Sequence, residues 1–315
     1  MLWILLGVVI LALLAVVVLY FYPKKVAQLQ ATGASDYSYE QSVAAIEQTL
    51  AEDKRHADVK EDCLPVARLH DKPTAKAVVM LHGISACPEQ FGELADTFYK
   101  AGYNVYVPRV PQHGFSDNAQ HAELSLNEMG VFLQHTADVA SGLGEEVGVV
   151  GLSGGGNMAS WLVQRSSVFS RALLLSPFYE PALRHVPKWQ IPFMMSLYGR
   201  NILPNYFNGE LAVRTVAKYV LLYNNYHPDL HAPALEHVAV VTSDLDDDID
   251  LALAHHVPQQ LAEVNNTTYQ ETRLSDDFAV YHDIVGPNAP GMSEHKAQLY
   301  QMYLEMYENT AEFEQ

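Results

Sequence analysis

The sequence predicts an α/β fold, in which a mostly parallel sheet is covered by helices on both faces. Two observations lead to this prediction. Short, continuous apolar runs alternate with longer segments of helical periodicity through most of the chain, and 49% of the 315 residues are hydrophobic, enough for a full core. Strands separated by helices of this length need crossover connections, which place them side by side in parallel. A third observation, one long uncharged run at the start, predicts an N-terminal transmembrane helix in addition.

This first apolar run covers residues 2–22 and carries no charged side chain. A helix of this length would be about 30 Å long, enough to cross the hydrocarbon core of a bilayer. Trp3, Tyr20 and Tyr22 lie near its ends, where interfacial aromatic residues are found. A cleaved signal peptide is the alternative, but the run is longer than a signal core and no Lys or Arg precedes it. We therefore expect residues 1–25 to be a single-pass membrane anchor.

The side of the membrane is predicted from the charges beside this run. Lys24 and Lys25 follow it directly. By the positive-inside rule these lysines stay in the cytoplasm, so we expect the catalytic part of the chain on the cytoplasmic side. Cys63 and Cys87 leave the redox compartment open, because two cysteines can be free or can form one bridge.

Residues 26–60 are polar and poor in strand-forming runs, which predicts a linker followed by one amphipathic helix. Within it, Val43, Ile46 and Leu50 recur at helical spacing between residues 40 and 52.

Residues 61–315 are expected to form the α/β domain. The expected strands are 77–81, 103–107, 147–151, 172–175, 237–241 and 268–274. The expected helices are 88–101, 127–141, one opening after residue 153, 251–264 and one from residue 293. A stretch at about 177–233 breaks the alternation and is expected to be an insertion.

The composition excludes several classes of function. A formal net charge of −18 argues against nucleic acid as a partner, since a phosphate backbone is bound by clustered Lys and Arg. Two cysteines cannot supply the four closely spaced ligands of a structural zinc site. We expect no metal and no cofactor.

A nucleophilic serine is predicted at position 153. Residues Gly151-Leu-Ser-Gly-Gly155 have the form G-x-S-x-G, directly after the apolar strand and before a helical run at 157–162. This strand–turn–helix context is what a nucleophile elbow requires, and small neighbours let the strand and the helix approach closely. A glycine-rich phosphate loop is the alternative, but neither common phosphate-loop pattern is present here.

An acid must follow the serine in the chain. The strand at 237–241 runs into a loop that contains Asp244, Asp246, Asp248 and Asp250. Asp248 and Asp250 are better placed to cap the next helix. Asp244 and Asp246 both remain candidates from the residues alone. The alternating aspartates also resemble a calcium loop, but the glycine and the final glutamate of such a loop are missing.

A histidine must act as base, and His282 is the strongest candidate. It lies on a loop near the end of the domain, where catalytic groups are often held by a rigid scaffold. His295 begins a charged helix, and His255 and His256 lie in the helix after the acid loop. We expect those three histidines to lie on helix surfaces without a catalytic role.

Two backbone N–H groups are expected to stabilise the oxyanion of an acyl-transfer reaction. They are those of Gly154, directly after the serine, and of Ile84, in the loop after the first buried strand. His82 precedes the serine, which is the wrong chain order for the base, and is expected to shape this loop.

With these residues in view, the chain resembles bacterial α/β-hydrolases of the carboxylesterase and monoacylglycerol-lipase group. The matching segments are Leu81-His-Gly-Ile-Ser-Ala-Cys-Pro88, Pro108-Arg-Val-Pro-Gln-His-Gly114, Gly151-Leu-Ser-Gly-Gly155, the loop with Asp246, and Tyr281-His-Asp283. The resemblance implies the α/β-hydrolase fold, Asp246 rather than Asp244 as the acid, and a helical cap at about 177–233. Six apolar cap residues then either pack as core or form an acyl-binding wall: Trp189, Phe193, Met194, Met195, Leu197 and Tyr198.

The resulting expectation is a membrane-anchored serine hydrolase that cleaves carboxylic esters with an apolar acyl group, through Ser153, His282 and Asp246. A peptidase, thioesterase or acyltransferase with the same three residues is an alternative, because one fold hosts many chemistries. A catalytically inactive, membrane-tethered binding module is a further alternative.

Overall fold

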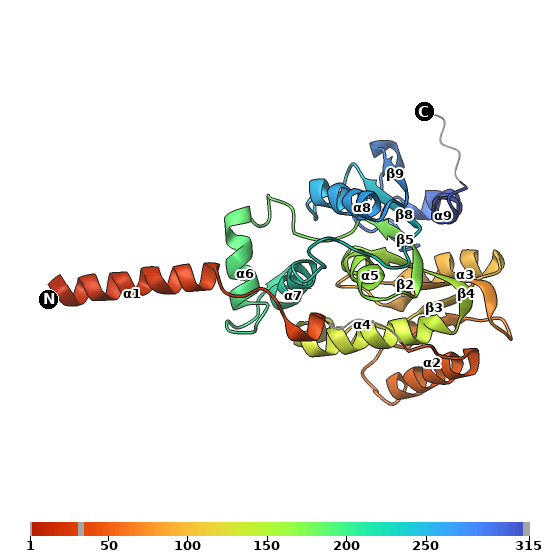
Figure 1. Cartoon of the computed structure of the whole chain (residues 1–315), viewed down its shortest axis with the longest axis horizontal. Coiled ribbons are helices and arrows are strands. Elements are labelled where there is room, and N and C mark those ends of the chain that lie inside the picture. The colour runs from red at the N-terminus through yellow and green to blue at the C-terminus, as the bar shows by residue number, and fades with distance from the viewer. Residues whose placement is uncertain (1, 31–34, 311–315) are drawn as a thin grey trace.

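A computed structural model of the chain describes residues 2–30 and 35–310 (Figure 1). Seven strands form one sheet in the order β1-β3-β2-β4-β5-β8-β9. The strands are β1 (Val66–Arg68), β2 (Thr74–Leu81), β3 (Asn104–Val107), β4 (Gly144–Leu152), β5 (Phe169–Leu175), β8 (His237–Ser243) and β9 (Thr268–Leu274). All neighbours pair in parallel except β1, which is antiparallel to β3. The predicted mostly parallel sheet is confirmed.

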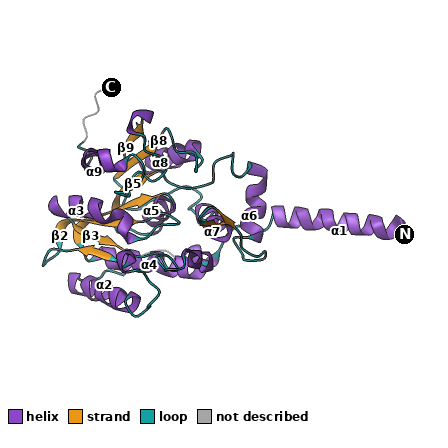
Figure 2. Ribbon diagram, turned by 180° about the vertical axis from the view of Figure 1, so that it is seen from behind, coloured by secondary structure: helices purple, strands orange, loops and turns teal. Residues whose placement is uncertain are grey.

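Helices cover both faces of this sheet (Figures 1 and 2). They are α2 (Tyr39–Asp53), α3 (Gly92–Lys100), α4 (Leu126–Ser141), α5 (Gly154–Arg165), α8 (Leu251–Asn265) and α9 (Met292–Glu308). Apolar side chains of α3 and α9 form the core on one face, and those of α4, α5 and α8 form the core on the other. Successive residues of β2 alternate between the two cores: Val78 belongs to one and Val79 to the other. This explains why the strand reads as an unbroken apolar run.

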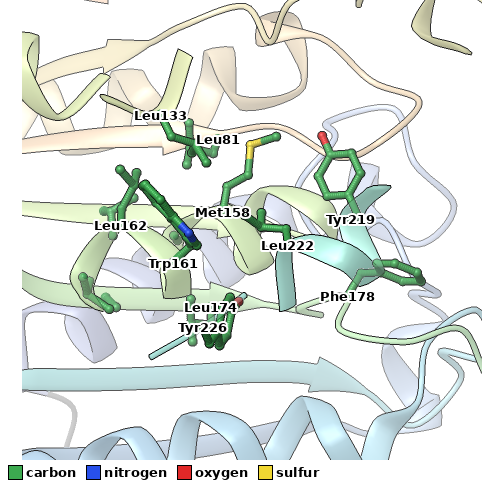
Figure 3. Close-up of a cluster of buried hydrophobic side chains, with 14 of the residues drawn as sticks. Leu81, Leu133, Met158, Trp161, Leu162, Leu174, Phe178, Tyr219, Leu222 and Tyr226 are labelled. Carbon is green, nitrogen blue, oxygen red and sulfur yellow. The ribbon is translucent and has the colours of Figure 1, made fainter. Parts of the chain in front are cut away.

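The larger core lies directly beneath the turn that follows β4. Trp161 of α5 packs there among Leu81, Leu133 and Met158 (Figure 3). Because α5 is buried along its whole length, its first turn is held firmly against the sheet.

The segment after the apolar run differs from the expected linker. Val26 and Leu29 are buried in the larger core, and the indole N–H of Trp161 donates to the Leu29 carbonyl at 3.2 Å. The amide of Asn225 accepts from the Val26 N–H and donates to the Lys24 carbonyl. Residues 24–30 are therefore part of the folded domain. The helix expected at 40–52 is present as α2.

The apolar run itself forms α1 (Leu2–Tyr20), which projects away from the domain (Figure 1). Residues Trp3–Tyr20 are long and apolar enough to cross a membrane, and none of this stretch is buried within the structure. Length and composition alone do not separate an anchor from a signal sequence.

Between β5 and β8 the chain departs from the alternation of sheet strands and helices. This segment contains a short 3-10 turn (Lys188–Gln190), α6 (Ile191–Leu197), a small hairpin of β6 (Phe207–Asn208) and β7 (Leu211–Ala212), and α7 (Val213–Tyr223). We call this segment the cap. α7 packs on α5, and α6 packs on α7 and on the end of α1.

Cys63 and Cys87 form a disulfide, which the sequence left open. It links the segment before β1 to the loop after β2.

Candidate active site

Ser153 occupies a sharp turn between β4 and α5, with φ of 56° and ψ of −119°. A non-glycine residue with positive φ is strained by about 1–3 kcal/mol and persists only where its surroundings fix it. Here the Ser153 N–H donates to the Leu175 carbonyl at 2.9 Å, and the Ser153 carbonyl accepts from the Phe178 N–H at 2.9 Å. The turn is thereby tied to β5 and to the start of the cap.

The glycines around the serine are required by close packing. A Cβ on Gly155 would lie 1.9 Å from the Leu81 carbonyl oxygen, and a Cβ on Gly151 would lie 2.2 Å from the carbonyl oxygen of Gly155. Any side chain at these two positions would push α5 away from the sheet and displace Ser153.

The structure brings Ser153, His282 and Asp246 together at the carboxyl edge of the sheet. His282 Nε2 lies 2.8 Å from Ser153 Oγ, and His282 Nδ1 lies 2.8 Å from Asp246 Oδ2. Nδ1 faces a carboxylate, so it carries the proton and donates, which leaves Nε2 free to accept from the serine hydroxyl. The Asp246 side chain is fully buried, whereas the His282 side chain is 23% exposed.

Asp244, Asp247 and Asp250 have partners away from His282. Asp244 pairs with Arg273 at 2.6 Å on the surface, and Asp247 pairs with Arg184. Asp250 caps α8 by accepting from the Leu253 N–H. Asp246, not Asp244, reaches His282. Asp248 lies near this pair, since potential ligand atoms of Asp246, Asp248 and His282 are all within 4.8 Å of one another.

The alternative histidines lie elsewhere. His255 contacts Thr242 and Glu271, and the His295 ring packs edge-on against Phe278. His256 is exposed on α8. His82 is buried beneath the serine loop, where its Nε2 accepts from the Val110 N–H at 3.0 Å. Burial and the neighbouring His113 lower the pKa of His82 to about 3, so it stays neutral and shapes the loop.

The charges around His282 favour its protonated form. Burial lowers the pKa of His282, but the hydrogen bond and charge of Asp246, together with the charges of Asp248 and Asp283, outweigh this effect and raise it. For Asp246, burial has the opposite effect and raises the pKa. The contacts of Asp246 with His282 and with the Asp248 N–H outweigh burial, so the net pKa lies below its ordinary value. Asp246 is therefore ionised at neutral pH.

Ile84 and Gly154 lie next to each other beside Ser153. Gly154 is the first residue of α5, so its N–H has no acceptor within the helix. A Cβ on Gly154 would lie 2.5 Å from Ile84 Cγ1, which shows how closely the two residues approach.

Sequence reasoning missed the residues that hold the Ile84 loop in place. Gln90 Oε1 accepts from the Gly83 N–H at 3.0 Å, and Gln90 Nε2 donates to Asp283 Oδ2 at 3.0 Å. The Ile84 loop and the His282 loop are therefore linked through one amide side chain. The signal available in the sequence was Asp283, a carboxylate directly after the candidate base.

A cavity of about 1000 Å³ opens beside Ser153 and His282. Five of the six apolar cap residues singled out above line it: Trp189, Phe193, Met194, Leu197 and Tyr198. Met195 is buried in the core instead. The cap thus contributes both core and an apolar cavity wall.

A serine on a strained strand–helix turn, followed along the chain first by a buried aspartate and then by the histidine that contacts both, is the arrangement of one class of α/β hydrolytic enzymes. The sequence profile of the alpha/beta hydrolase family matches residues 78–306. The chain belongs to this family. No match to the chain was found among curated proteins.

Several solved structures share the fold. One of the metagenome-derived lipolytic enzymes LipS and LipT superposes with a TM-score of 0.52 at 18% identity, covering 80% of this chain and 99% of the other. A soluble variant of monoglyceride lipase from Saccharomyces cerevisiae, in complex with a substrate analogue, has a TM-score of 0.57 at 10% identity, covering 78% and 91%. Est1E from Butyrivibrio proteoclasticus, bound to ferulic acid, has a TM-score of 0.51 at 14% identity, covering 77% and 95%.

Proposed function

We propose that the chain is a membrane-anchored serine hydrolase that cleaves carboxylic esters through an acyl-enzyme. The observation that carries this proposal is the pair of 2.8 Å contacts that connect Ser153, His282 and Asp246. A serine hydroxyl is a poor nucleophile unless a neighbouring base takes its proton, and this arrangement supplies the base and its orienting acid.

The reaction follows from the positions of these groups. Ser153 Oγ attacks the ester carbonyl carbon while His282 Nε2 takes the hydroxyl proton. The N–H groups of Ile84 and Gly154 donate to the resulting oxyanion, each contribution being typically about 3 kcal/mol. His282 then returns the proton to the departing alcohol. A water molecule, deprotonated by the same nitrogen, releases the acid and restores Ser153.

The apolar cavity supports an ester with a hydrocarbon acyl group. Burial of apolar surface contributes roughly 0.8 kcal/mol per methylene, so a wall of Trp, Phe, Met and Leu favours longer chains. The neighbouring structures include proteins described as lipolytic enzymes and as a monoglyceride lipase, which is consistent with this substrate class.

The test is substrate profiling of the full-length chain in detergent micelles. We expect a fluorophosphonate probe to label the chain, and p-nitrophenyl esters to be hydrolysed faster than matched thioesters and peptides. A faster thioester or peptide reaction would assign the same residues to another acyl transfer. Absence of labelling would instead support the inactive binding module.

The pH dependence of the reaction provides a prediction. His282 must be neutral to accept the serine proton, and its pKa is raised above the ordinary value of 6.5. We therefore expect kcat/KM to fall as the pH is lowered, with its midpoint above pH 6.5. Replacing Asp283 by asparagine should shift this midpoint downward, because one of the charges that raise the pKa is removed. A midpoint unmoved or raised in Asp283→Asn would contradict the assignment of His282 as the base.

We propose that α1 is retained as the anchor. The hydroxyl of Ser196 in α6 donates to the Leu19 carbonyl at 2.8 Å, and Lys24 Nζ donates to Ser196 Oγ at 2.8 Å. The rings of Tyr20 and Phe193 pack edge to face, with centroids 5.7 Å apart. A signal peptide has no need of such contacts with the mature domain.

The disulfide favours an oxidising compartment for the domain, opposite to the prediction from the positive-inside rule. Bridges are rare in the cytosol, where thiols are kept reduced. Lys24 and Lys25 both bond to the folded domain, Lys25 through the Tyr226 carbonyl, so their presence is explained without a role in topology. We propose that the domain lies outside the cytoplasm.

This proposal predicts that neither Cys63 nor Cys87 is free. A maleimide added to the denatured, unreduced protein should label neither cysteine, and both after reduction. Labelling of both thiols without reductant in protein taken directly from its membrane would place the domain in a reducing compartment.

A further inference from the structure

We propose that the active-site cavity is filled from the membrane. The cap surface around the end of α1 lies in the membrane interface, and the substrate is an acyl ester that passes from the adjoining lipid leaflet into the cavity. This inference rests on the proposed function and adds the physical source of the substrate to it.

The first observation is that α6 lies between the anchor and the cavity. Phe193 contacts Tyr20 at the end of α1 and also lines the cavity. Trp189 packs edge-on against Phe193, with ring centroids 6.5 Å apart, and lines the same cavity. One seven-residue helix therefore touches the anchor and forms the wall of the acyl site.

The second observation is the orientation of this helix. In both views α6 runs across the axis of α1, at the end of the domain nearest to it (Figures 1 and 2). A bilayer crossed by α1 would therefore meet α6 lengthwise. The loop that follows α6 is held at the same end, because Arg200 donates to the Pro23 carbonyl and stacks over the ring of Tyr22.

The third observation is the composition of this end of the cap. Trp189, Ile202, Tyr206 and Phe207 are 45–63% exposed, although the chain as a whole is strongly acidic. We call these four residues the mouth surface. Three of them also line the cavity, so the exposed apolar surface continues into the acyl site. The other large apolar residues exposed in the described part of the domain come from separate segments of the chain: Val131, Leu183, Val264 and Tyr281.

Three cations lie where α1 meets the cap. Lys24 and Lys25 lie four and five residues beyond the end of α1, and Arg200 lies three residues beyond α6, in a chain with a net charge of −18. Trp and Tyr rings with flanking Lys and Arg are the side chains that settle at the headgroup level. Exposing these apolar side chains to water is energetically unfavourable. Contact with lipid explains both the exposed rings and the neighbouring charges.

Tryptophan fluorescence tests the placement of the cap independently of catalysis. The chain has three tryptophans, of which Trp161 is buried in the core and Trp3 lies in α1. In full-length Trp3→Phe protein reconstituted in phosphatidylcholine vesicles, lipids with brominated acyl chains should quench Trp189. The Trp3→Phe/Trp189→Phe protein is the matched control and should show no such loss. Equal emission losses in the two proteins would overturn the proposal.

Activity tests the route of the substrate. Ile202 belongs to the mouth surface but does not line the cavity. We expect Ile202→Glu to slow hydrolysis of monooleoylglycerol embedded in phosphatidylcholine vesicles by about tenfold, since about 1.4 kcal/mol of lost interfacial contact is a factor of ten. Hydrolysis of water-soluble p-nitrophenyl acetate should be nearly unchanged. Val264→Glu, at an equally exposed apolar site on α8, is the control and should affect neither substrate.

The outcomes separate the two proposals. An Ile202→Glu protein that retains the full rate on vesicle-borne ester would overturn delivery from the leaflet while leaving the esterase assignment intact. Failure of the unaltered chain on both esters would count against the esterase assignment, and the Trp189 quenching would still decide where the cap lies. If Ile202→Glu lost both activities through misfolding, the same fluorescence comparison would decide the proposal.

Discussion

Replacing Ser153 by alanine is expected to lower kcat/KM for p-nitrophenyl esters by about 10⁴-fold or more, because members of such a triad act as a unit. The hydroxyl contacts His282 at 2.8 Å, and the backbone bonds that hold the turn do not involve the side chain. The variant should therefore fold normally. Initial rates over a range of substrate concentrations, together with thermal unfolding, provide the measurement.

Ser166→Ala is the matched control for this experiment. Ser166 lies at the other end of α5 and bonds only locally, to the Val168 N–H. It should retain both activity and fluorophosphonate labelling, whereas Ser153→Ala should lose both. Full activity in a folded Ser153→Ala protein would end the proposal of an acyl-enzyme.

Replacing Asp246 by asparagine is expected to reduce kcat by about 10⁴-fold, the size of effect seen when the orienting acid of a triad is lost. An amide can donate to His282 Nδ1, which would favour the tautomer whose proton sits on Nε2, where it cannot accept from Ser153. The same change removes the largest influence that raises the pKa of His282. Steady-state kinetics above pH 7 isolate the effect of the tautomer.

Asp244→Asn tests the alternative acid directly. Asp244 forms a surface ion pair with Arg273, and exposed pairs of this kind contribute about 0–1 kcal/mol to stability. We expect Asp244→Asn to retain nearly full activity. The reverse pattern, with Asp244→Asn inactive and Asp246→Asn active, would reassign the acid.

Much of the fold could be predicted because each buried parallel strand appears in the sequence as a short, continuous apolar run. The runs that became β2, β4, β5 and β8 are apolar on both faces, and the turn chemistry around Ser153 requires small residues that are visible in the sequence. β1 was missed because it has only three residues and is partly exposed, so no periodicity can develop.

The parts that escaped prediction depend on tertiary contacts. Residues 24–30 read as polar linker because only Val26 and Leu29 enter the core. The residues alone did not separate Asp244 from Asp246, since both follow the same strand, and the choice of Asp246 came from the family resemblance. The Gln90 link between two loops joins positions 193 residues apart, and no local pattern reports such a contact.

Residues 24–30 do not form a flexible linker between α1 and the body of the protein, because their backbone is hydrogen-bonded to Asn225 and Trp161. A flexible tether would let a domain sample a hemisphere of solution, with a radius that grows with tether length. With α1 in a bilayer, this molecule instead keeps one face toward the lipid. If the proposed delivery from the membrane holds, its encounters with ester follow lateral diffusion in two dimensions, and the reaction rate depends on the surface density of the ester rather than on its molarity in water.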